Sequence, residues 1–553
     1  MPSLRSHLRR HPLALFIGSA LVLGAVLVSS PRLEQAFGRV PHSLAWGPAL
    51  FRVLLAGHGL ALILAGLLIA GDGAPEWNGT PRRDCLILAG LTLLAALLSL
   101  PSLNSCLWLD EVLALVHYAR LSLGWIFTSY SDQNQHMLYS LLAHCCLRLF
   151  GEQAWALRLP AVVFGAASVP ALFLLGRRLL GAGEALAACA LLTVSYHRIW
   201  FAQNARGYTG LLCLTLLATW FWLEALESNR WRAWLGYSAC VALGMWIHMT
   251  MLFVAAAHAL IFLVVWVRSG RSSKLLGRAA AAFALCGTLS LQIYALSLPE
   301  FFRGTLATAP GTASATVWTN PWWTLAEALR SLRVGSAAIV VVVLGGAMFA
   351  AGWIRILRRQ ARAAWAMVLP AAFTAAAMLG LEHCIYPRFF FFSAGFGLLI
   401  LIHGALLAAR WRPLAGYALA GLMIAASALT VPRCYKLPKQ DFLGARDYVE
   451  RRRAPDEPVI ALSLASHAYT EYYAPSWPAA WSAAELDARR GSTGRAFVVY
   501  TLPEDLRAFH PDLWTAVHTD FETLKIFPGT LGGGEVYVCR ERPRPGGQEA
   551  TPK

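Results

Sequence analysis

The sequence predicts an all-α polytopic membrane protein with about 13 transmembrane helices, followed by a small α/β domain. Composition is the first reason: 57% of the 553 residues are hydrophobic and 14% are charged, whereas soluble domains carry about a quarter charged residues. The second reason is that the apolar residues come in runs of about 17–22, the length that crosses a hydrocarbon core. We expect spans near residues 13–29, 48–70, 85–101, 155–176, 184–203, 208–226, 233–249, 250–268, 279–298, 336–356, 364–383, 388–408 and 413–431.

The first apolar run determines how the chain enters the membrane. The segment before it, MPSLRSHLRRH, has the charge pattern of a signal peptide, but no clear small-residue cleavage site follows the run. We therefore expect a retained first helix with the basic N-terminus in the cytoplasm.

The net charge of +17 reflects membrane topology rather than nucleic-acid binding. No block of Lys and Arg interleaves with aromatic residues in a soluble segment, so we expect no nucleic-acid partner. When the spans are counted from a cytoplasmic N-terminus, the basic clusters all fall on the cytoplasmic side, as the positive-inside rule requires. These clusters are Arg9/Arg10, Arg82/Arg83, Arg177/Arg178, Arg230/Arg232, Arg268/Arg271/Lys274, Arg355/Arg358/Arg359 and Arg410/Arg412.

The same count leaves two large loops, 102–154 and 299–335, on the outer side of the membrane. The first contains a weaker apolar stretch, LYSLLAHCCLRLFG, which we expect to form a helix along the membrane interface. The second is rich in Thr, Ala, Pro and Trp, which predicts an irregular loop near the headgroup layer. The smaller outer segments are 30–47, 198–207, a turn near His248, and 384–388.

A change in composition after residue 432 predicts a second domain. Residues 1–432 would form the membrane domain, and residues 433–542 a small extracytoplasmic α/β domain. Within the latter, FLGARDYVERRR is typical of an amphipathic helix, and PVIALSL, RAFVVYTL and GGGEVYVCRER are typical of short strands. The tail PRPGGQEATPK, residues 543–553, is expected to be disordered.

Asp110 and Glu111 are the first candidates for chemistry. They follow the third span in LNSCLWLDEVLALVHYAR, on the outer side of the membrane, in a chain where acidic residues are scarce. A carboxylate in a partly desolvated cleft can act as a general base toward a hydroxyl or an amine. The alternative is a pair of charges at a helix N-terminus, which the helix dipole favours without any catalytic role.

Other catalytic motifs are absent from the sequence. It contains no P-loop, no GxGxxG after a strand, no HExxH and no GxSxG elbow. The eleven cysteines show no CxxC spacing, so we predict neither a zinc site nor a disulfide framework. Chemistry would therefore depend on carboxylates, arginines and histidines at the outer boundary.

Four segments, taken in order, carry a resemblance to a known family. They are the Asp110-Glu111 pair, LYSLLAHCCLRLFG, WALRLPAVVFGAASVPALFLLGRRLLG and FAQNARGYTG. Together they resemble the GT-C superfamily of glycosyltransferases that use polyprenyl-phosphate sugars. Within it they are similar to the family 39-type branch of protein O-mannosyltransferases and lipid A aminoarabinose transferases. The resemblance covers residues 85–270 closely and the remaining spans more loosely.

The resemblance implies roles for individual residues. Asp110 would be the catalytic base that activates the acceptor, and Glu111 would support it by hydrogen bonding or near a metal. Arg206 and Tyr208 match the family's Arg-x-Tyr and would bind the donor phosphate, which a guanidinium can contact through two nitrogens, or hold the loop. The alternative for Arg206 is a snorkelling arginine. Asn204 replaces a family glutamate, so a divalent metal remains possible but no ligand set is predicted.

Four further residues are candidates for substrate binding. Arg388, in HCIYPRFFFF, matches an Arg-aromatic pair of the family and is suited to a lipid phosphate; the alternative is an interface anchor. His248 matches a family histidine at an outer helix end, although a lone histidine on an apolar helix is more often structural. His136 and Asn134 lie in the acceptor loop, where Gln135-His136 replaces the family's Pro-Pro.

We therefore expect an integral glycosyltransferase of the bacterial plasma (inner) membrane, active on the outer face. The resemblance implies a polyprenyl-phosphate sugar donor, a protein, lipid or glycan acceptor, contact with membrane lipid, and inversion at the anomeric carbon. The absence of a soluble nucleotide-sugar domain favours the lipid-linked donor. The alternative is a non-catalytic transporter or flippase of lipid-linked glycans. It is disfavoured because the polar candidates lie at the outer boundary and no inverted repeat is evident.

Overall fold

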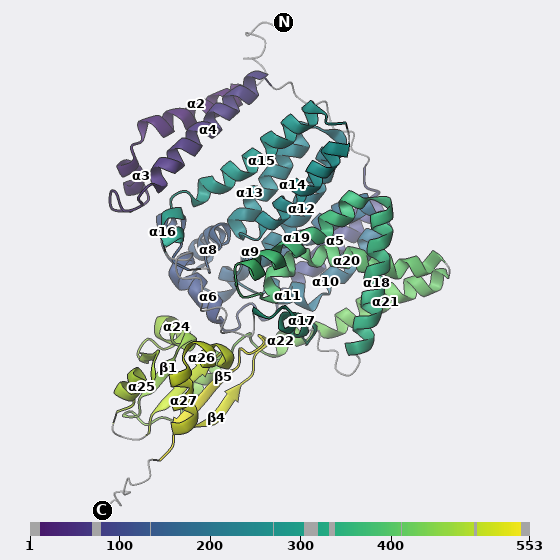
Figure 1. Cartoon of the computed structure of the whole chain (residues 1–553). Helices are drawn as coiled ribbons and strands as arrows, with labels where there is room; N and C mark the ends of the chain where they lie inside the picture. Colours follow the sequence, from purple (N-terminus) through teal and green to yellow (C-terminus); the bar gives the residue numbers. More distant parts are fainter. Residues whose placement is uncertain are drawn as a thin grey trace, which may run out of the picture.

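The computed structural model describes residues 12–68, 79–132, 134–268, 270–303, 319–330, 338–410, 412–491 and 495–543. These residues fold into a helical bundle followed by a small mixed domain, which lies at one end of the bundle (Figure 1). Most of the predicted outer loop 299–335, the tail from residue 544 and the basic pair Arg9/Arg10 lie outside the described residues.

The bundle consists of α-helices joined by short turns, with a π-helical segment (η1) and two 3₁₀ segments (η5, η6). The bounds are α2 Pro12–Leu27, α3 Ser30–Ala36, α4 Gly47–Leu68, α5 Arg82–Leu97, α6 Leu109–Ala114, η1 Leu115–Ala119, α7 Leu123–Thr128, α8 Met137–Phe150, α9 Ala154–Leu179, α10 Ala182–Thr193, α11 Tyr196–Ala202, α12 Tyr208–Ser228, α13 Trp231–Ile247, α14 Met251–Arg268, α15 Ser273–Tyr294, α16 Leu298–Arg303, α17 Pro321–Arg330, α18 Ala338–Arg359, α19 Ala361–Gly380, η5 Pro387–Ser393, α20 Ala394–Leu407, η6 Ala408–Arg410, α21 Pro413–Thr430 and α22 Arg433–Lys436.

The membrane spans agree with the prediction in position. Each predicted span coincides with a helix or with a bent helix pair. Nine helices of the described residues are long and apolar enough to cross a membrane, or up to eleven if each bent pair is one span. The remaining two predicted spans are α5 and α13, which have only 16 and 17 residues. The predicted fold class, an all-α polytopic membrane protein, is confirmed.

The spans differ in how deeply they are buried. In α9 and α12, 61% and 72% of the span residues are inside the protein, whereas in α18 only 11% are. Central helices contact other helices on all sides, and peripheral ones leave apolar side chains such as Ile339 and Val343 for lipid. Peripheral α2 and α4 pack closely because Gly18 faces Gly59: a Cβ at either position would lie 2.6 Å from the other's carbonyl oxygen.

Two departures from straight spans shape the end of the bundle near the small domain. The pair α10–α11 is bent by 60°, and Ser195 caps α11 by accepting a hydrogen bond from the Arg198 N–H at 3.5 Å. The chain then turns through residues 203–207 before α12 begins at Tyr208. The predicted interfacial stretch forms α8, an apolar helix too short to cross a membrane.

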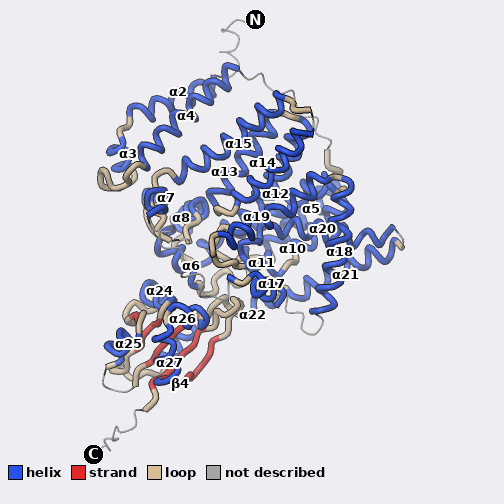
Figure 2. Tube along the Cα trace, in the orientation of Figure 1, coloured by secondary structure: helices blue, strands red, loops and turns tan. Residues whose placement is uncertain are grey.

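The C-terminal domain contains the strands of the described residues (Figure 2). Its five-stranded sheet has the order β2-β1-β3-β5-β4. β1 runs parallel to β2 and β3, and β5 runs antiparallel to β3 and β4. The bounds of its elements are α23 Phe442–Glu450, β1 Val459–Leu462, α24 Leu464–Ala468, the π-helix η7 Tyr469–Tyr473, β2 Ala479–Ala480, α25 Ala483–Arg490, β3 Phe497–Thr501, α26 Pro503–Phe509, α27 Pro511–Asp520, β4 Phe521–Phe527 and β5 Val536–Glu541.

The strands β1 and β3 are buried along their whole length, which explains their continuous apolar sequences. In β1, Val459 and Ala461 face one core, and Ile460 and Leu462 face the other. The first core also contains Leu109 and Leu113, which belong to α6 of the bundle. The short helix that carries Asp110 and Glu111 is therefore packed into the core of the C-terminal domain. The predicted small α/β domain is confirmed.

Candidate active site

Asp110 lies in the first turn of α6 and points toward a guanidinium from a distant part of the chain. Its Oδ2 is 3.1 Å from Nη1 of Arg388. Arg388 belongs to η5, and its guanidinium stacks over the ring of Tyr386 at 4.4 Å. The Asp110 side chain is 12% exposed, so it is neither sealed in the core nor freely solvated. This is the environment in which a carboxylate can exchange a proton with a bound molecule.

Glu111 is in a different situation, although it is the next residue. Its side chain is fully buried and pairs through both oxygens with Arg158, at 2.7 and 2.5 Å. Burial alone would raise the pKa of Glu111, but the charges of Arg158 and Lys439 outweigh that effect and hold the pKa below its ordinary value. The Ala205 N–H also donates to Glu111, at 2.7 Å. Glu111 is thus an ionised residue that joins α6 to the 203–207 turn.

Arg206 lies on that turn and Tyr208 begins α12 directly after it, opposite the loop that contains Asn134 and His136. Nη1 of Arg206 donates to the backbone oxygen of Asn134 at 2.6 Å. Nδ1 of His136 accepts a hydrogen bond from the Gly207 N–H at 3.1 Å. The ring of His136 lies 5.5 Å from that of Tyr208. The two predicted loops therefore meet directly at these residues.

His248 completes an aromatic cluster with His136 and Tyr208. The ring centroids of His248 and His136 are 4.9 Å apart, and those of His248 and Tyr208 are 5.6 Å apart. Burial and the charges of Arg206 and Arg388 lower the pKa of His136 well below its ordinary value. The cluster is thus kept neutral between two arginines.

Asn204, which replaces the family's glutamate, contacts the same region. Its Oδ1 accepts a hydrogen bond from Nε1 of Trp108 at 3.0 Å. Its Nδ2 is buried without a hydrogen-bond partner among the described residues, and so are Nε of Arg206 and Nε of Arg388. Buried donors of this kind are normally satisfied. Three unsatisfied donors around one site are expected of a place that receives a ligand rich in acceptor oxygens.

The nine residues singled out in the sequence are thus brought into one region. Asp110 pairs with Arg388, Glu111 bonds the turn that carries Asn204, Arg206 and Tyr208, and this turn meets Asn134, His136 and His248. Within the part of the chain that the structure describes, no group of three or more His, Cys, Asp and Glu side chains is arranged to hold a metal ion.

Several residues around the site are absent from the sequence-based list. Arg158 also donates to the backbone oxygens of Leu103 and Ser105, at 2.7 and 3.0 Å, and so fixes the loop before α6. The sequence does contain a signal for Arg158, because it is the lone charged residue in the matched run WALRLP. Tyr473 and Gln440, by contrast, come from the C-terminal domain, where no motif marks them.

Those two residues hold the backbone at the start of α6. The Tyr473 hydroxyl accepts from the Leu107 N–H at 2.6 Å and donates to the Leu107 carbonyl at 3.0 Å. Oε1 of Gln440 accepts from the Leu109 N–H at 3.0 Å. The ammonium group of the neighbouring Lys439 donates to the carbonyl of Gln203. The C-terminal domain therefore positions both the Asp110 helix and the 203–207 turn.

Asp505, on α26 of the C-terminal domain, adds a carboxyl group within electrostatic range of Arg388. Burial raises the pKa of Asp505 to about 6; the charge of Arg388 opposes the rise and that of Glu504 adds to it. The C-terminal domain thus contributes a titratable group near the Asp110–Arg388 pair.

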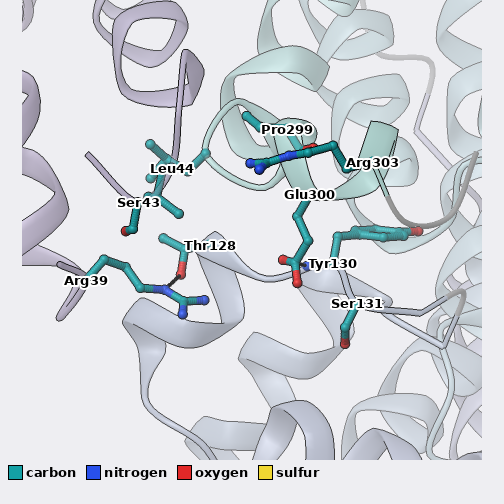
Figure 3. A pocket seen from close by; sticks show the side chains of 10 residues that line it. Arg39, Ser43, Leu44, Thr128, Tyr130, Ser131, Pro299, Glu300 and Arg303 are labelled. Atoms are coloured by element: carbon teal, nitrogen blue, oxygen red, sulfur yellow. Dashed lines mark hydrogen bonds between the residues drawn. The ribbon is translucent and has the colours of Figure 1, made fainter. Parts of the chain in front are cut away.

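A cavity of about 490 Å³, lined by both polar and apolar residues, lies where the acceptor loop meets the segment between α3 and α4. Its lining includes Thr128, Tyr130 and Ser131, directly before the loop that contacts Arg206, and also Arg39 and Arg303 (Figure 3). Figure 3 shows Glu300 between the two arginines, and its Oε2 accepts from the Tyr130 N–H at 2.8 Å. The glutamate thus fixes the loop wall of this cavity.

Comparison with solved structures returns several matches at low sequence identity. The apo crystal structure of ArnT from Cupriavidus metallidurans aligns over 82% of this chain and 97% of its own, with 14% identity and a TM-score of 0.47. The Archaeoglobus fulgidus oligosaccharyltransferase, in complex with Zn and sulfate, aligns over 82% and 72%, with 12% identity and a TM-score of 0.45. Arabinosyltransferase EmbB from Mycobacterium smegmatis aligns over 72% and 46%, with 15% identity and a TM-score of 0.44.

Comparison with protein families gives a match over part of the chain. No curated protein matches the sequence significantly. Residues 135–291 match the family described as dolichyl-phosphate-mannose-protein mannosyltransferase. This stretch contains three of the four segments on which the sequence resemblance rested, up to and including the Arg206–Tyr208 turn. The resemblance is confirmed over that stretch, which is 157 of the 553 residues.

Proposed function

We propose that the protein transfers a sugar from a polyprenyl-phosphate donor to an acceptor on the outer face of the membrane, with inversion at the anomeric carbon. The donor's tail would lie among the spans, and its phosphate would lie at the level of Arg206 and Arg388. The acceptor, a protein, a lipid or another glycan, would approach from the side of the loops and the C-terminal domain.

The observation that carries this proposal is the pair of unsatisfied arginine N–H groups. Nε of Arg206 and Nε of Arg388 are buried without a partner among the described residues. Buried donors that lack acceptors cost about 1–3 kcal/mol each. A phosphate supplies several acceptor oxygens and negative charge, so a guanidinium binds it more strongly than it binds a neutral group. A lipid phosphate therefore suits both arginines.

The Asp110–Arg388 pair suggests how binding and chemistry are linked. In the free protein the carboxylate is held by Arg388. When the donor phosphate takes the guanidinium, the Asp110 carboxylate becomes available to the acceptor. The acceptor oxygen attacks the anomeric carbon, its proton passes to Asp110, and the bond from that carbon to the phosphate oxygen breaks. The electron pair leaves with the phosphate, whose charge the arginines stabilise.

The assignment of the site to the outer face has its own support. The basic clusters fit a cytoplasmic N-terminus. The described chain begins with α2 at the end of the molecule opposite to the C-terminal domain (Figure 1). The candidate site lies next to that domain, through α6 and the 203–207 turn. A cytoplasmic N-terminus would then leave the site outside.

A transfer assay tests the proposal. Purified protein is offered radiolabelled polyprenyl-phosphate sugars, and transfer and donor hydrolysis are both followed. We expect turnover with at least one donor, and a loss of about 10²–10⁴-fold in Asp110→Asn, because the amide cannot accept the proton. The matched control is Asp447→Asn, which removes an exposed carboxylate on α23 that pairs with the neighbouring Arg446. Full activity of Asp110→Asn, or no turnover and no binding across the panel, would contradict the proposal.

A further inference from the structure

His117 lies at the junction between the outer loop and the C-terminal domain, and both of its ring nitrogens face carboxylates. Nδ1 is 3.0 Å from Oδ2 of Asp132, and Nε2 is 2.9 Å from Oε2 of Glu471. Asp132 belongs to the loop before α8, and Glu471 belongs to η7 of the C-terminal domain. A neutral imidazole carries only one N–H, so both contacts are satisfied together only by the protonated ring.

The contacts continue on the bundle side to the candidate phosphate-binding residue. The other oxygen of Asp132, Oδ1, accepts from the Asn134 N–H at 2.7 Å. The backbone oxygen of Asn134 in turn accepts from Nη1 of Arg206 at 2.6 Å. An unbroken series of hydrogen bonds therefore runs from His117 to Arg206.

The series also continues into the C-terminal domain. Oε1 of Glu471 lies 2.7 Å from Nδ1 of His467 on α24. The rings of His117 and His467 are 6.5 Å apart and edge to face. His117 therefore connects two segments, the acceptor loop at Asp132 and residues 464–473 of the C-terminal domain.

His117 is linked to Asp110 as well, through the helix that bears both. α6 and η1 form one helical stretch from Leu109 to Ala119. Its first half is held by Arg158 and by the core of the C-terminal domain. Its second half is held through His117. One side chain thus anchors the helix of the candidate base and the loop that orients Arg206.

The charges around His117 favour its protonated form. The hydrogen bond to Asp132 is the largest cause of a raised pKa; burial opposes it, and the charges of Glu471 and Asp132 add to it. The other groups that face this cluster are His467 on α24, Tyr118 on the same helix as His117, and Arg206, whose charge stabilises ionised Asp132. The side chains of His117, Asp132 and Glu471 are 30%, 31% and 26% exposed, so protons can reach them.

We propose that His117 is a positioning residue that, as an imidazolium between Asp132 and Glu471, couples the C-terminal domain to the loop that orients Arg206. The inference rests on the proposed transferase function and goes beyond it by assigning a proton-dependent connection. A raised pKa in the folded state means that the bridge is complete below pH 6.5, the ordinary pKa of histidine. It is lost as the pH rises through the higher pKa of the folded protein.

The first test compares pH profiles of transfer. The wild type should lose activity as the pH rises through the pKa of His117. His117→Gln, which is neutral at every pH, should be slower at pH 6 by about 5–30-fold, the range of a lost 1–2 kcal/mol of positioning, and should lack this alkaline decline. His117→Lys keeps a fixed cation and should retain activity at a higher pH than the wild type. The control is His518→Gln, an exposed ring on α27 that contacts the backbone oxygen of Trp514 in its own helix.

The second test needs no activity. Amide hydrogen exchange in detergent, corrected for intrinsic rates, is followed for residues 131–136 and 464–473 at pH 6 and pH 8. Both segments should exchange faster in His117→Gln than in the wild type at pH 6, and wild-type exchange should rise toward that of the variant at pH 8. Unchanged exchange in His117→Gln, or a pH profile of transfer that keeps its alkaline decline, would overturn the coupling. A wild type without turnover on any donor would overturn the proposed function, and the exchange result would still decide the coupling.

Discussion

The bundle and the C-terminal domain hold the same short helix, α6, by different physical means. On the bundle side, the fully buried Glu111–Arg158 pair joins the helix to α9 and, through Ala205, to the turn before α12. On the domain side, Leu109 and Leu113 enter an apolar core. A buried ion pair depends on both partners, because either one alone leaves an uncompensated charge. When one residue is substituted, apolar packing and neutral hydrogen bonds lose a smaller part of their contribution to stability.

These two kinds of support explain how Asp110 is positioned. The ion pair fixes the direction of α6 against the bundle, and the C-terminal domain closes the opposite face. The Asp110 side chain takes part in neither the ion pair nor the apolar core, and its carboxylate contacts Arg388. If this comparison is right, substitutions on the bundle side should affect stability more than those on the domain side.

The largest effect is expected from Arg158→Leu. It leaves Glu111 buried and unpaired and removes the bonds to the Leu103 and Ser105 carbonyls, so stability should fall by about 3–5 kcal/mol. Chemical unfolding in detergent measures this loss. Adding Glu111→Leu should restore a large part of it, because the buried charge is then absent.

The control for this prediction is Arg120→Leu. Arg120 pairs with Glu152 at 2.6 Å, but both side chains are more than a third exposed. Solvent screens such a pair, so its loss should cost less than about 1 kcal/mol. Equal losses for Arg158→Leu and Arg120→Leu would show that the buried pair is not what holds α6.

A smaller effect is expected on the domain side from Tyr473→Phe. The variant leaves the Leu107 N–H and carbonyl without the hydroxyl that contacts both, a loss of about 1–3 kcal/mol. Because Leu107 lies just before α6, the transfer rate should fall more than the overall stability suggests. Rate and unfolding are measured on the same preparation.

The comparison variant is Tyr448→Phe, whose ring packs against Phe527 inside the C-terminal domain. It removes the same hydroxyl group from the same domain and should leave transfer unchanged. A Tyr473→Phe enzyme with the wild-type rate would mean that the domain only covers the site and does not position it.

The sequence predicted the bundle better than the C-terminal domain for a physical reason. Long apolar runs are a direct consequence of the membrane's thickness, so the predicted spans coincide with helices. In the domain, the apolar strands β1, β3 and β5 were foreseen, but β2 and β4 were not. β2 has two residues, and β4 is mostly exposed between its ends, so neither has the apolar run by which a strand is recognised.

The candidate site was likewise predictable only where a sequence motif marks the residue. Asp110, Arg206 and Arg388 were identified from motifs, and the structure adds that Asp110 and Arg388 are in contact although they are 278 positions apart. His117 and Glu471 carry no motif, and their role appears only when the domain docks against the loop. Arg158 could have been predicted from the sequence but was not. A lone charge in an apolar run needs a buried partner, and this marks Arg158 as a structural residue.

The most direct test of the central claim separates binding from chemistry at the Asp110–Arg388 pair. Donor affinity and the single-turnover transfer rate are measured side by side for Asp110→Asn and Arg388→Gln. We predict that Asp110→Asn binds the donor at least as tightly as the wild type, because Arg388 is released from its partner, and transfers about 10²–10⁴-fold more slowly. Arg388→Gln should weaken donor binding about tenfold or more. Wild-type transfer by Asp110→Asn, or an equal loss of donor affinity in both variants, would contradict the account.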